Sequence, residues 1–566
     1  MQGSQMSAMS RWAQSSLALV TKCLSAIHCR SKGLIARLLV SVIVVIASAV
    51  TAQAKGTSIA TQSGWVAMAS RQPDGIRVFK GLAYAAPPLG ERRWQPPGRL
   101  PAWRGTARVD EFAPDCLQPD NDASPPSRPK SEDCLYLNIW TPRVGAAQNP
   151  VFVWIHGGGS QFGSGAQPQF DGSALARQGI VVVTVNYRLG ALGFLSIPQL
   201  SRASGYGASG NYGFMDQLAA LRWVKANIAK FGGDPRRVTI GGESSGSVST
   251  GTLMASPLAR ELFSGVIGES GSVMRVVGDG SMGADTLANE EAKGALLMKE
   301  LGAASVADMR KAAASAVLSA AGRLFPKYFF NVPVVDGYVL PDAPSRIFQA
   351  HAQNDVPLLV GWNSGEGSME LMFRGRFPPA SEQLRALYAN HSKRIAEFYT
   401  KTSSGPIQTG LAISGDAAFG YPTWKWGYAQ VRSGRSQTFI YCFDWAPKLT
   451  PGLFGERFDV RHAGSFHGAE VPYVFGTLRH MAGWKIRPED LRVSEQMTRY
   501  WANFIRSGNP NGAQLPNWPA YALSAEPKRM RLGLIPAAAT DPDFAKFLAI
   551  DAFHSDAGPP LPTPPR

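Results

Sequence analysis

A serine between two glycines is the first feature of this sequence that could do chemistry. Ser244 lies in Gly242–Gly246, which reads Gly-Glu-Ser-Ser-Gly and follows an apolar stretch that ends at Ile240. The residues after it, Ser247–Ala255, can continue as a helix. A Gly-x-Ser-x-Gly segment between a strand and a helix forms a strained turn that presents the serine hydroxyl as a nucleophile. The less specific interpretation is a simple glycine–serine turn.

A second segment could stabilise the charge that such a nucleophile creates. His156–Gly159 reads His-Gly-Gly-Gly and follows another apolar stretch, Val151–Ile155. When a serine attacks an ester, the carbonyl oxygen becomes an oxyanion that needs fixed backbone N–H donors. The sequence is of the type that supplies them, so we expect the donors to be the N–H groups of Gly158, Gly159 and Ser245. A merely flexible glycine loop is the alternative.

The base must be a histidine, and in this type of hydrolase the chain order is serine, acid, histidine. His467 stands between Gly464 and Gly468, in a segment that follows the apolar stretch Thr438–Phe443. Its imidazole could therefore reach over the edge of a sheet. His462, five residues earlier, is the alternative base.

Two carboxylates could orient the histidine. Glu366 lies just past an apolar stretch that ends at Val360, in a short glycine-containing loop. Asp336 also follows an apolar stretch and precedes a glycine, so it is the rival. Taken alone, either residue is more often a solvated loop carboxylate.

These residues need strands and helices that bring them together. Short apolar stretches alternate with longer segments of helical periodicity, which predicts a mostly parallel sheet covered by helices on both faces. The predicted strands include Val151–Ile155, Ile180–Val185, Val238–Ile240, Val356–Val360 and Thr438–Phe443, and one predicted helix is Asp216–Lys230. The stretches Pro119–Asp133 and Lys401–Asp416 are predicted to be long polar loops within one large domain, residues 55–566, whose C-terminal tail from Gly558 is rich in proline.

With these residues and motifs the chain resembles the type-B carboxylesterase family, which includes cholinesterases, bacterial para-nitrobenzyl esterases and the noncatalytic neuroligins. The resemblance extends over essentially the whole chain after residue 54. It rests on Phe79–Gly81, Trp94–Pro97, Ser131–Trp140, His156–Gly159, Asn186–Leu195, Gly210–Glu243, Phe263–Ser272, the Glu366 loop, His467–Glu470, Val474–Gly476 and Trp501–Phe504.

The resemblance implies an α/β-hydrolase fold and a serine carboxylesterase that uses neither a metal nor a cofactor. It implies that Ser244, Glu366 and His467 form the catalytic triad. It also implies that Glu243 and Ser270 support the histidine. The partner is then a small-molecule ester, hydrolysed through an acyl-enzyme intermediate.

Two positions depart from the family pattern. Ser245 stands where the family usually has alanine, but its N–H can still donate to an oxyanion. Ser160 replaces the usual aromatic residue after the three glycines, which alters the expected shape of the acyl or alcohol pocket.

Other activities on the same fold are alternatives. One is a noncatalytic adhesion or binding module, whose known relatives typically lose the nucleophile that this chain keeps. Another is an amidase or carbamate hydrolase, because it would use the same machinery. The sequence has no basic stripe interleaved with aromatic residues and no zinc-finger spacing, so a nucleic-acid partner is not expected.

The first 54 residues have the pattern of a secretory signal. Five basic residues and no acid precede the 13-residue apolar run Leu38–Val50, and Ala52-Gln53-Ala54 gives a small-x-small exit, so we expect cleavage after Ala54. An uncleaved anchor is the alternative, but the run is shorter than the roughly 20 residues that span a bilayer. Removal of the signal lowers the formal charge from +16 to +11. The protein is therefore expected to be secreted or periplasmic.

The remaining cysteines agree with export. Cys116 and Cys134 flank a polar, proline-rich stretch, and Cys442 lies in an apolar run. In an oxidising compartment the first two could form a bridge, with two unpaired thiols as the alternative. The family resemblance implies the Cys116–Cys134 disulfide.

Overall fold

The structure is a computed structural model that describes residues 58–557, apart from residues 70 and 147 and the segments 122–126, 276–282, 325–329, 375–376, 401–404 and 456–458. The predicted signal region and the proline-rich tail therefore lie outside the described residues. Residues 60–566 group into one compact unit, separate from residues 1–59.

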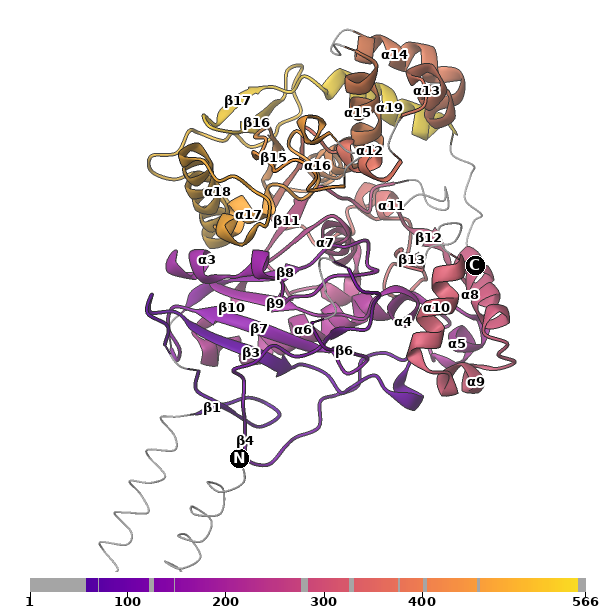
Figure 1. Ribbon diagram of the computed structural model, residues 1–566, viewed down its shortest axis with the longest axis vertical. Helices are drawn as coiled ribbons and strands as arrows, with labels where there is room; N and C mark the ends of the chain where they lie inside the picture. Colours follow the sequence, from indigo (N-terminus) through magenta and orange to yellow (C-terminus); the bar gives the residue numbers. More distant parts are fainter. Residues whose placement is uncertain are drawn as a thin grey trace, which may run out of the picture. The chain divides into compact units, whose positions relative to one another are not determined.

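Ten of the described strands form one sheet, in the order β17-β16-β15-β14-β11-β10-β8-β9-β7-β3 (Figure 1). In chain order these strands are β3 (Arg77–Ala83), β7 (Tyr136–Thr141), β8 (Asn149–Ile155), β9 (Val181–Val185), β10 (Gly233–Glu243), β11 (Gly265–Glu269), β14 (Leu358–Asn363), β15 (Thr438–Phe443), β16 (Lys528–Leu532) and β17 (Ala537–Thr540). From β9 to β16 all neighbouring strands are parallel, whereas β3, β7 and β17 pair antiparallel at the two ends. The sheet is therefore mostly parallel, as predicted.

The central strands are apolar because both faces of the sheet are covered. Every residue of β9, β14 and β15 is buried. In β8, Phe152 and Trp154 join the core cluster that contains Trp501 of a long C-terminal helix. Val151 and Val153 alternate with them and are buried on the opposite face, since successive side chains of a strand point to opposite faces of the sheet. This double burial explains the continuous apolar runs, which differ from the alternating pattern of a sheet with one solvated face.

Helices connect and flank these strands. The described helices are α3 (Ser173–Arg177), α4 (Gly190–Phe194), α5 (Pro198–Ala203), α6 (Tyr212–Asn227), α7 (Ser245–Ala255), α8 (Leu287–Glu300), α9 (Val306–Lys311), α10 (Ala314–Leu324), α11 (Pro344–Gln349), α12 (Ser368–Arg374), α13 (Ala380–Tyr388), α14 (Ser392–Thr400), α15 (Pro406–Gly415), α16 (Tyr421–Ser433), α17 (Val471–Phe475), α18 (Pro488–Ser507) and α19 (Phe544–Ala557). The short strands outside the large sheet are β1 (Ser58–Ala60), β2 (Trp65–Ala67), β4 (Thr106–Ala107), β5 (Asp115–Cys116), β6 (Lys130–Ser131), β12 (Asp285–Thr286) and β13 (Val334–Val335). No described helix is long and apolar enough to cross a membrane.

One loop prediction is wrong. Most of Lys401–Asp416 is helical, because α15 begins at Pro406 and runs to Gly415. Proline is favoured in the first turn of a helix, and the small residue Gly410 lets the helix approach the Phe377 ring closely. Tertiary packing therefore overrides the polar and glycine-rich composition that suggested a loop.

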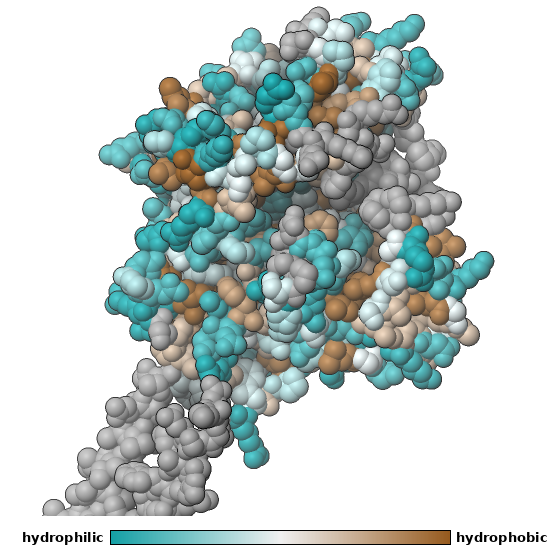
Figure 2. All heavy atoms as spheres, in the orientation of Figure 1, coloured by the Kyte–Doolittle hydropathy of each residue, from teal (hydrophilic) through white to brown (hydrophobic). Residues whose placement is uncertain are grey.

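The surface face in Figure 2 is mostly hydrophilic, with hydrophobic residues scattered in small groups rather than in one continuous patch. Exposed hydrophobic side chains that occur singly are usual on a folded protein.

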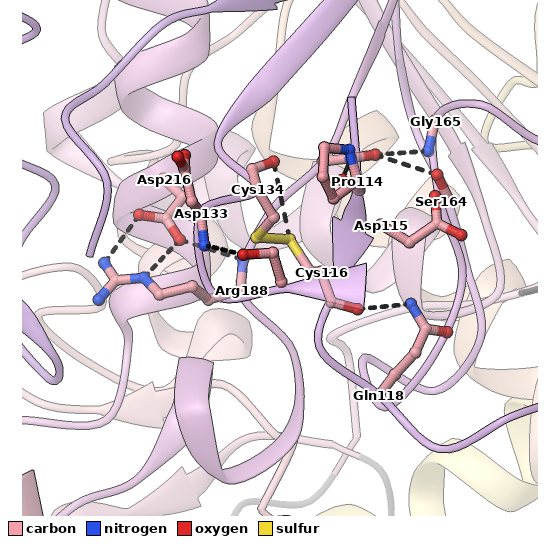
Figure 3. Close-up of a disulfide and its surroundings, with 12 residues drawn as sticks. Pro114, Asp115, Cys116, Gln118, Asp133, Cys134, Ser164, Gly165, Arg188 and Asp216 are labelled. Atoms are coloured by element: carbon pink, nitrogen blue, oxygen red, sulfur yellow. Dashed lines mark hydrogen bonds and ion pairs between the residues drawn. A yellow bond between two sulfur atoms is a disulfide. The ribbon is translucent and has the colours of Figure 1, made fainter. Parts of the chain in front are cut away.

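The predicted disulfide between Cys116 and Cys134 is confirmed, and Figure 3 shows its surroundings. Gln118 donates from Nε2 to the Cys116 carbonyl at 2.9 Å. The same amide exchanges two hydrogen bonds with the backbone of Gly163, a few residues after the three-glycine segment. The disulfide loop thus braces the loop that follows β8. Cys442 is buried and free.

Candidate active site

Ser244 occupies a sharp turn between β10, which ends at Glu243, and α7, which begins at Ser245. Its backbone has φ +58° and ψ −123°, a conformation that is uncommon for a residue other than glycine. The Ser244 N–H donates to the Glu269 carbonyl at 2.8 Å, and its own carbonyl accepts from Val248 N–H at 3.0 Å. These bonds hold the strained turn and leave the serine side chain at its apex.

The neighbouring glycine is required by a close approach of two backbones. A Cβ added at Gly246 would lie 2.1 Å from the Ile155 carbonyl oxygen, at the end of β8. A side chain there would push α7 away from the β8 loop. The glycine therefore sets the distance between the serine and the three-glycine segment.

The three-glycine segment lies directly beside Ser244. A Cβ added at Gly157 would lie 3.1 Å from the Ser244 Cβ. Within the described part of the chain, none of the N–H groups of Gly158, Gly159 and Ser245 donates to another protein atom. Ser245 is also the first residue of α7, where the helix presents free N–H groups and a partial positive charge. The segment thus offers three uncommitted donors next to the serine.

His467 comes from the long connection after β15, and Glu366 from the loop after β14. His467 Nδ1 lies 2.7 Å from Glu366 Oε2. The other oxygen, Oε1, accepts from the Asn363 backbone N–H at 2.9 Å, and Glu366 is only 2% exposed. The Phe419 ring packs on the imidazole with a centroid distance of 4.1 Å. The carboxylate is thereby fixed in a position where it can select one imidazole tautomer.

The second ring nitrogen of His467 faces another carboxylate. Nε2 lies 3.2 Å from Glu243 Oε1, an atom that has no aligned hydrogen-bond partner among the described residues. No described hydrogen bond joins the Ser244 hydroxyl to His467. Catalytic hydrogen bonds are often loose in the free enzyme and tighten only when substrate binds.

The surrounding charges favour a protonated imidazole. Burial lowers the pKa of His467, but the carboxylates of Glu243 and Glu366 outweigh this effect and raise it to about 9. Burial raises the pKa of Glu243 to about 7, against the opposing effect of His467. An imidazolium is the form that the histidine must adopt when it accepts the serine proton.

Among the described residues, no hydrogen bond joins Ser270 to His467. Its hydroxyl donates to Glu470 Oε1 at 3.5 Å, and Asn363 Nδ2 donates to the other oxygen of Glu470. Burial and the nearby carboxylates raise the pKa of Glu470 to about 8. Ser270 binds Glu470, whose charge favours the protonated imidazole, whereas Glu243 faces His467 directly.

The two alternative candidates lie elsewhere. Asp336 accepts from Asn211 Nδ2 at 2.8 Å and from the backbone N–H groups of Tyr338 and Leu340, so it shapes a turn. His462 ends a short 3₁₀ helix, and its backbone N–H donates to Asp459. Of the two candidate acids, Glu366 is thus the one that the structure pairs with His467.

Reasoning from the sequence assigned no role to Glu470 or Phe419. Glu470 lies only three residues after His467 in the sequence, and this short spacing could have indicated that it is near the site. Phe419 lies on a π-helical turn between α15 and α16, and only the packing of these helices brings it to the imidazole. Within the ranges that the structure describes, no cluster of three His, Cys, Asp or Glu side chains has a metal-binding arrangement.

Comparisons with known proteins identify the family of this chain. The model of the carboxylesterase family matches residues 56–544. Fumonisin B1 esterase of Sphingopyxis macrogoltabida is 36% identical over 477 residues, which are 80% of this chain and 82% of that protein. Para-nitrobenzyl esterase of Bacillus subtilis is 33% identical over 79% of this chain and 89% of its own length.

Among solved structures, the carboxylesterase Est55 of Geobacillus stearothermophilus superimposes with a TM-score of 0.76 at 33% identity, covering 87% of this chain and 99% of that one. A para-nitrobenzyl esterase structure also matches with a TM-score of 0.76, at 30% identity. The chain therefore belongs to the carboxylesterase family. It is a carboxylic ester hydrolase with an α/β fold.

Proposed function

We propose that Ser244 is the nucleophile of this esterase, that His467 is its general base and acid, and that Glu366 orients the histidine. The N–H groups of Gly158 and Gly159, with that of Ser245 after the nucleophile, form the oxyanion hole. The observation that supports this assignment is the meeting of three parts at one edge of the sheet: a strained serine turn, a 2.7 Å His467–Glu366 pair and three uncommitted N–H donors.

In the acylation step, Ser244 Oγ forms a bond to the ester carbonyl carbon while His467 Nε2 takes the hydroxyl proton. The carbonyl oxygen becomes an anion that accepts from the three N–H donors. When the tetrahedral intermediate collapses, the bond from carbon to the alcohol oxygen breaks, and His467 gives its proton to the departing alcohol. The acyl group remains on Ser244.

In the deacylation step, His467 takes a proton from water as the water oxygen attacks the acyl carbon. The second tetrahedral intermediate breaks its bond to Ser244 Oγ, which recovers the proton from the imidazole. The carboxylic acid is released. Glu243 and Glu366 lie on either side of the imidazolium that forms in both steps and stabilise its charge.

The test is hydrolysis of p-nitrophenyl butyrate by the Ser244→Ala variant. Loss of the nucleophile is expected to lower kcat by about 10⁴- to 10⁶-fold. A fluorophosphonate probe should label the wild-type protein once and the variant not at all. Turnover at the wild-type rate in Ser244→Ala would show that another group is the nucleophile.

We also propose that the protein is exported, with cleavage after Ala54. The basic and apolar pattern of residues 1–54 supports this, and so does the Cys116–Cys134 disulfide, because such bonds persist in oxidising compartments. N-terminal sequencing of the protein recovered outside the cytoplasm should begin at Lys55. A chain that still contains Leu38–Val50 would favour a membrane anchor.

A further inference from the structure

Two side chains hold opposite ends of one peptide group in the three-glycine loop. Asn331 Nδ2 donates to the Gly159 carbonyl oxygen at 2.5 Å. The N–H of the same peptide group, which belongs to Ser160, donates to Ser245 Oγ at 2.9 Å. Asn331 comes from the segment just before β13, whereas Ser245 comes from the start of α7. Segments far apart in the sequence thus fix a single peptide plane.

This peptide group adjoins the proposed oxyanion donors. Its carbonyl belongs to Gly159, whose N–H is one of those donors, and the N–H of Gly158 lies one residue earlier. Gly158 has φ +97°, Gly159 has φ +61° and Ser160 has φ +53°, so the chain turns through three successive residues with positive φ. Serine adopts this conformation less readily than glycine, so the loop needs outside contacts to stay in it.

Ser245 connects the two halves of the oxyanion hole. Its backbone N–H is the donor contributed by α7, and its hydroxyl ties α7 to the loop that contributes the other two donors. Ser160 is 2% exposed and Ser245 6% exposed, so little water can replace this bond. The alanine that the family usually carries at position 245 would leave the Ser160 N–H without this acceptor.

We propose that the hydroxyl of Ser245 and the amide of Asn331 are positioning residues that set the geometry of the oxyanion hole by holding the Gly159–Ser160 peptide group. This inference rests on the proposed roles of Gly158, Gly159 and Ser244. Neither side-chain group touches the reacting atoms. They act by keeping the loop donors at the distance from the α7 donor that a tetrahedral oxyanion requires.

Ser245→Ala removes the acceptor, and Asn331→Leu removes the amide donor at a similar side-chain size without adding a charge. Each variant should lower kcat for p-nitrophenyl butyrate by about 5- to 30-fold, the effect of one unmade buried hydrogen bond, while KM changes less than twofold. The kcat of the double variant should fall by less than the product of the two single-variant decreases, because both contacts hold the same peptide group. Ser245→Thr keeps the hydroxyl and should recover most of the loss.

Inhibition by a trifluoromethyl ketone tests the positioning role separately from protein stability, because a loss of stability alone would not change the inhibition constant. Ser244 Oγ adds to the ketone carbon, His467 takes the proton, and the ketone oxygen becomes an anion in the oxyanion hole. The inhibition constant should therefore rise by the same factor as kcat falls. Fluorophosphonate titration, which counts active serines, corrects for any misfolded fraction.

Thr252→Val is the matched control. Thr252 is buried in α7, and its hydroxyl donates only to the Val248 carbonyl of the same helix. This variant loses a buried hydroxyl from the same helix but no contact to the loop. We expect a changed melting temperature with unchanged kcat and unchanged inhibition constant.

The outcomes separate this inference from the assignment on which it rests. If Ser244→Ala is inactive while Ser245→Ala and Asn331→Leu match the wild type in kcat and inhibition constant, the positioning role is wrong and the nucleophile assignment stands. A loss of kcat that matches the loss of titratable serine, or a change in KM alone, also overturns the positioning role. If Ser244→Ala stays active, the nucleophile assignment itself fails.

Discussion

The charge of Glu243 should set the pH at which the enzyme becomes active. Glu243→Gln removes the negative charge of a carboxylate whose Oε1 lies 3.2 Å from His467 Nε2. At an effective dielectric constant of about 20, a unit charge at this distance contributes about 5 kcal/mol, or roughly 4 pKa units, as an upper bound. Glu243 itself has a pKa raised by burial to about 7, so it is ionised where His467 titrates, near 9.

The direction in which the pH profile moves follows from the role of the imidazole. Only neutral His467 can accept the serine proton, so kcat/KM rises with pH through the pKa of this group in the free enzyme. Loss of the Glu243 charge makes the imidazolium less stable and lowers that pKa. We expect the acid limb of kcat/KM to move to lower pH by about 2 units, half of the Coulomb upper bound, since relaxation and solvent weaken the interaction.

The assay is titrimetric hydrolysis of ethyl butyrate between pH 5 and 10, because this substrate does not ionise in that range. The midpoint of the limb is compared, rather than the maximal rate, so that other effects of the substitution do not enter. Asp336→Asn is the control, since Asp336 binds Asn211 and a turn and not His467. A Glu243→Gln midpoint equal to that of the wild type would refute the reasoning.

Two further predictions follow from the site and the disulfide. Glu366→Gln should lower kcat for p-nitrophenyl butyrate by about 10⁴-fold, because the amide no longer selects the imidazole tautomer or stabilises its charge. Asp336→Asn should change kcat little. The opposite order of the two effects would reassign the acid. Replacing Cys116 and Cys134 by serine removes a bridge between residues 18 apart and should lower the free energy of unfolding by about 3 kcal/mol. Urea denaturation measures this change. An unchanged unfolding midpoint would contradict the stabilising role of the bridge.

Local sequence patterns were enough to predict the parts of the fold that depend on neighbouring residues. The serine turn needs a strand, two glycines and a helix in succession, and Gly242–Gly246 specifies all of them within a few residues. Buried parallel strands read as continuous apolar runs, so β8, β9 and β15 were predicted to within about two residues of their observed bounds. The mostly parallel sheet followed from these runs and the helical segments between them.

Contacts between groups far apart in the sequence became known from the folded structure. From the residues alone, Glu366 was the predicted acid and Asp336 remained its rival, because each is a carboxylate in a loop after an apolar stretch. The order of strands places β14 beside β15, so the loop that carries Glu366 meets the connection that carries His467. The contacts of Asn331 and Ser245 with one peptide group likewise depend on packing between segments far apart in sequence. Local periodicity carries no information on such pairings, because burial and hydrogen bonding across the fold select them.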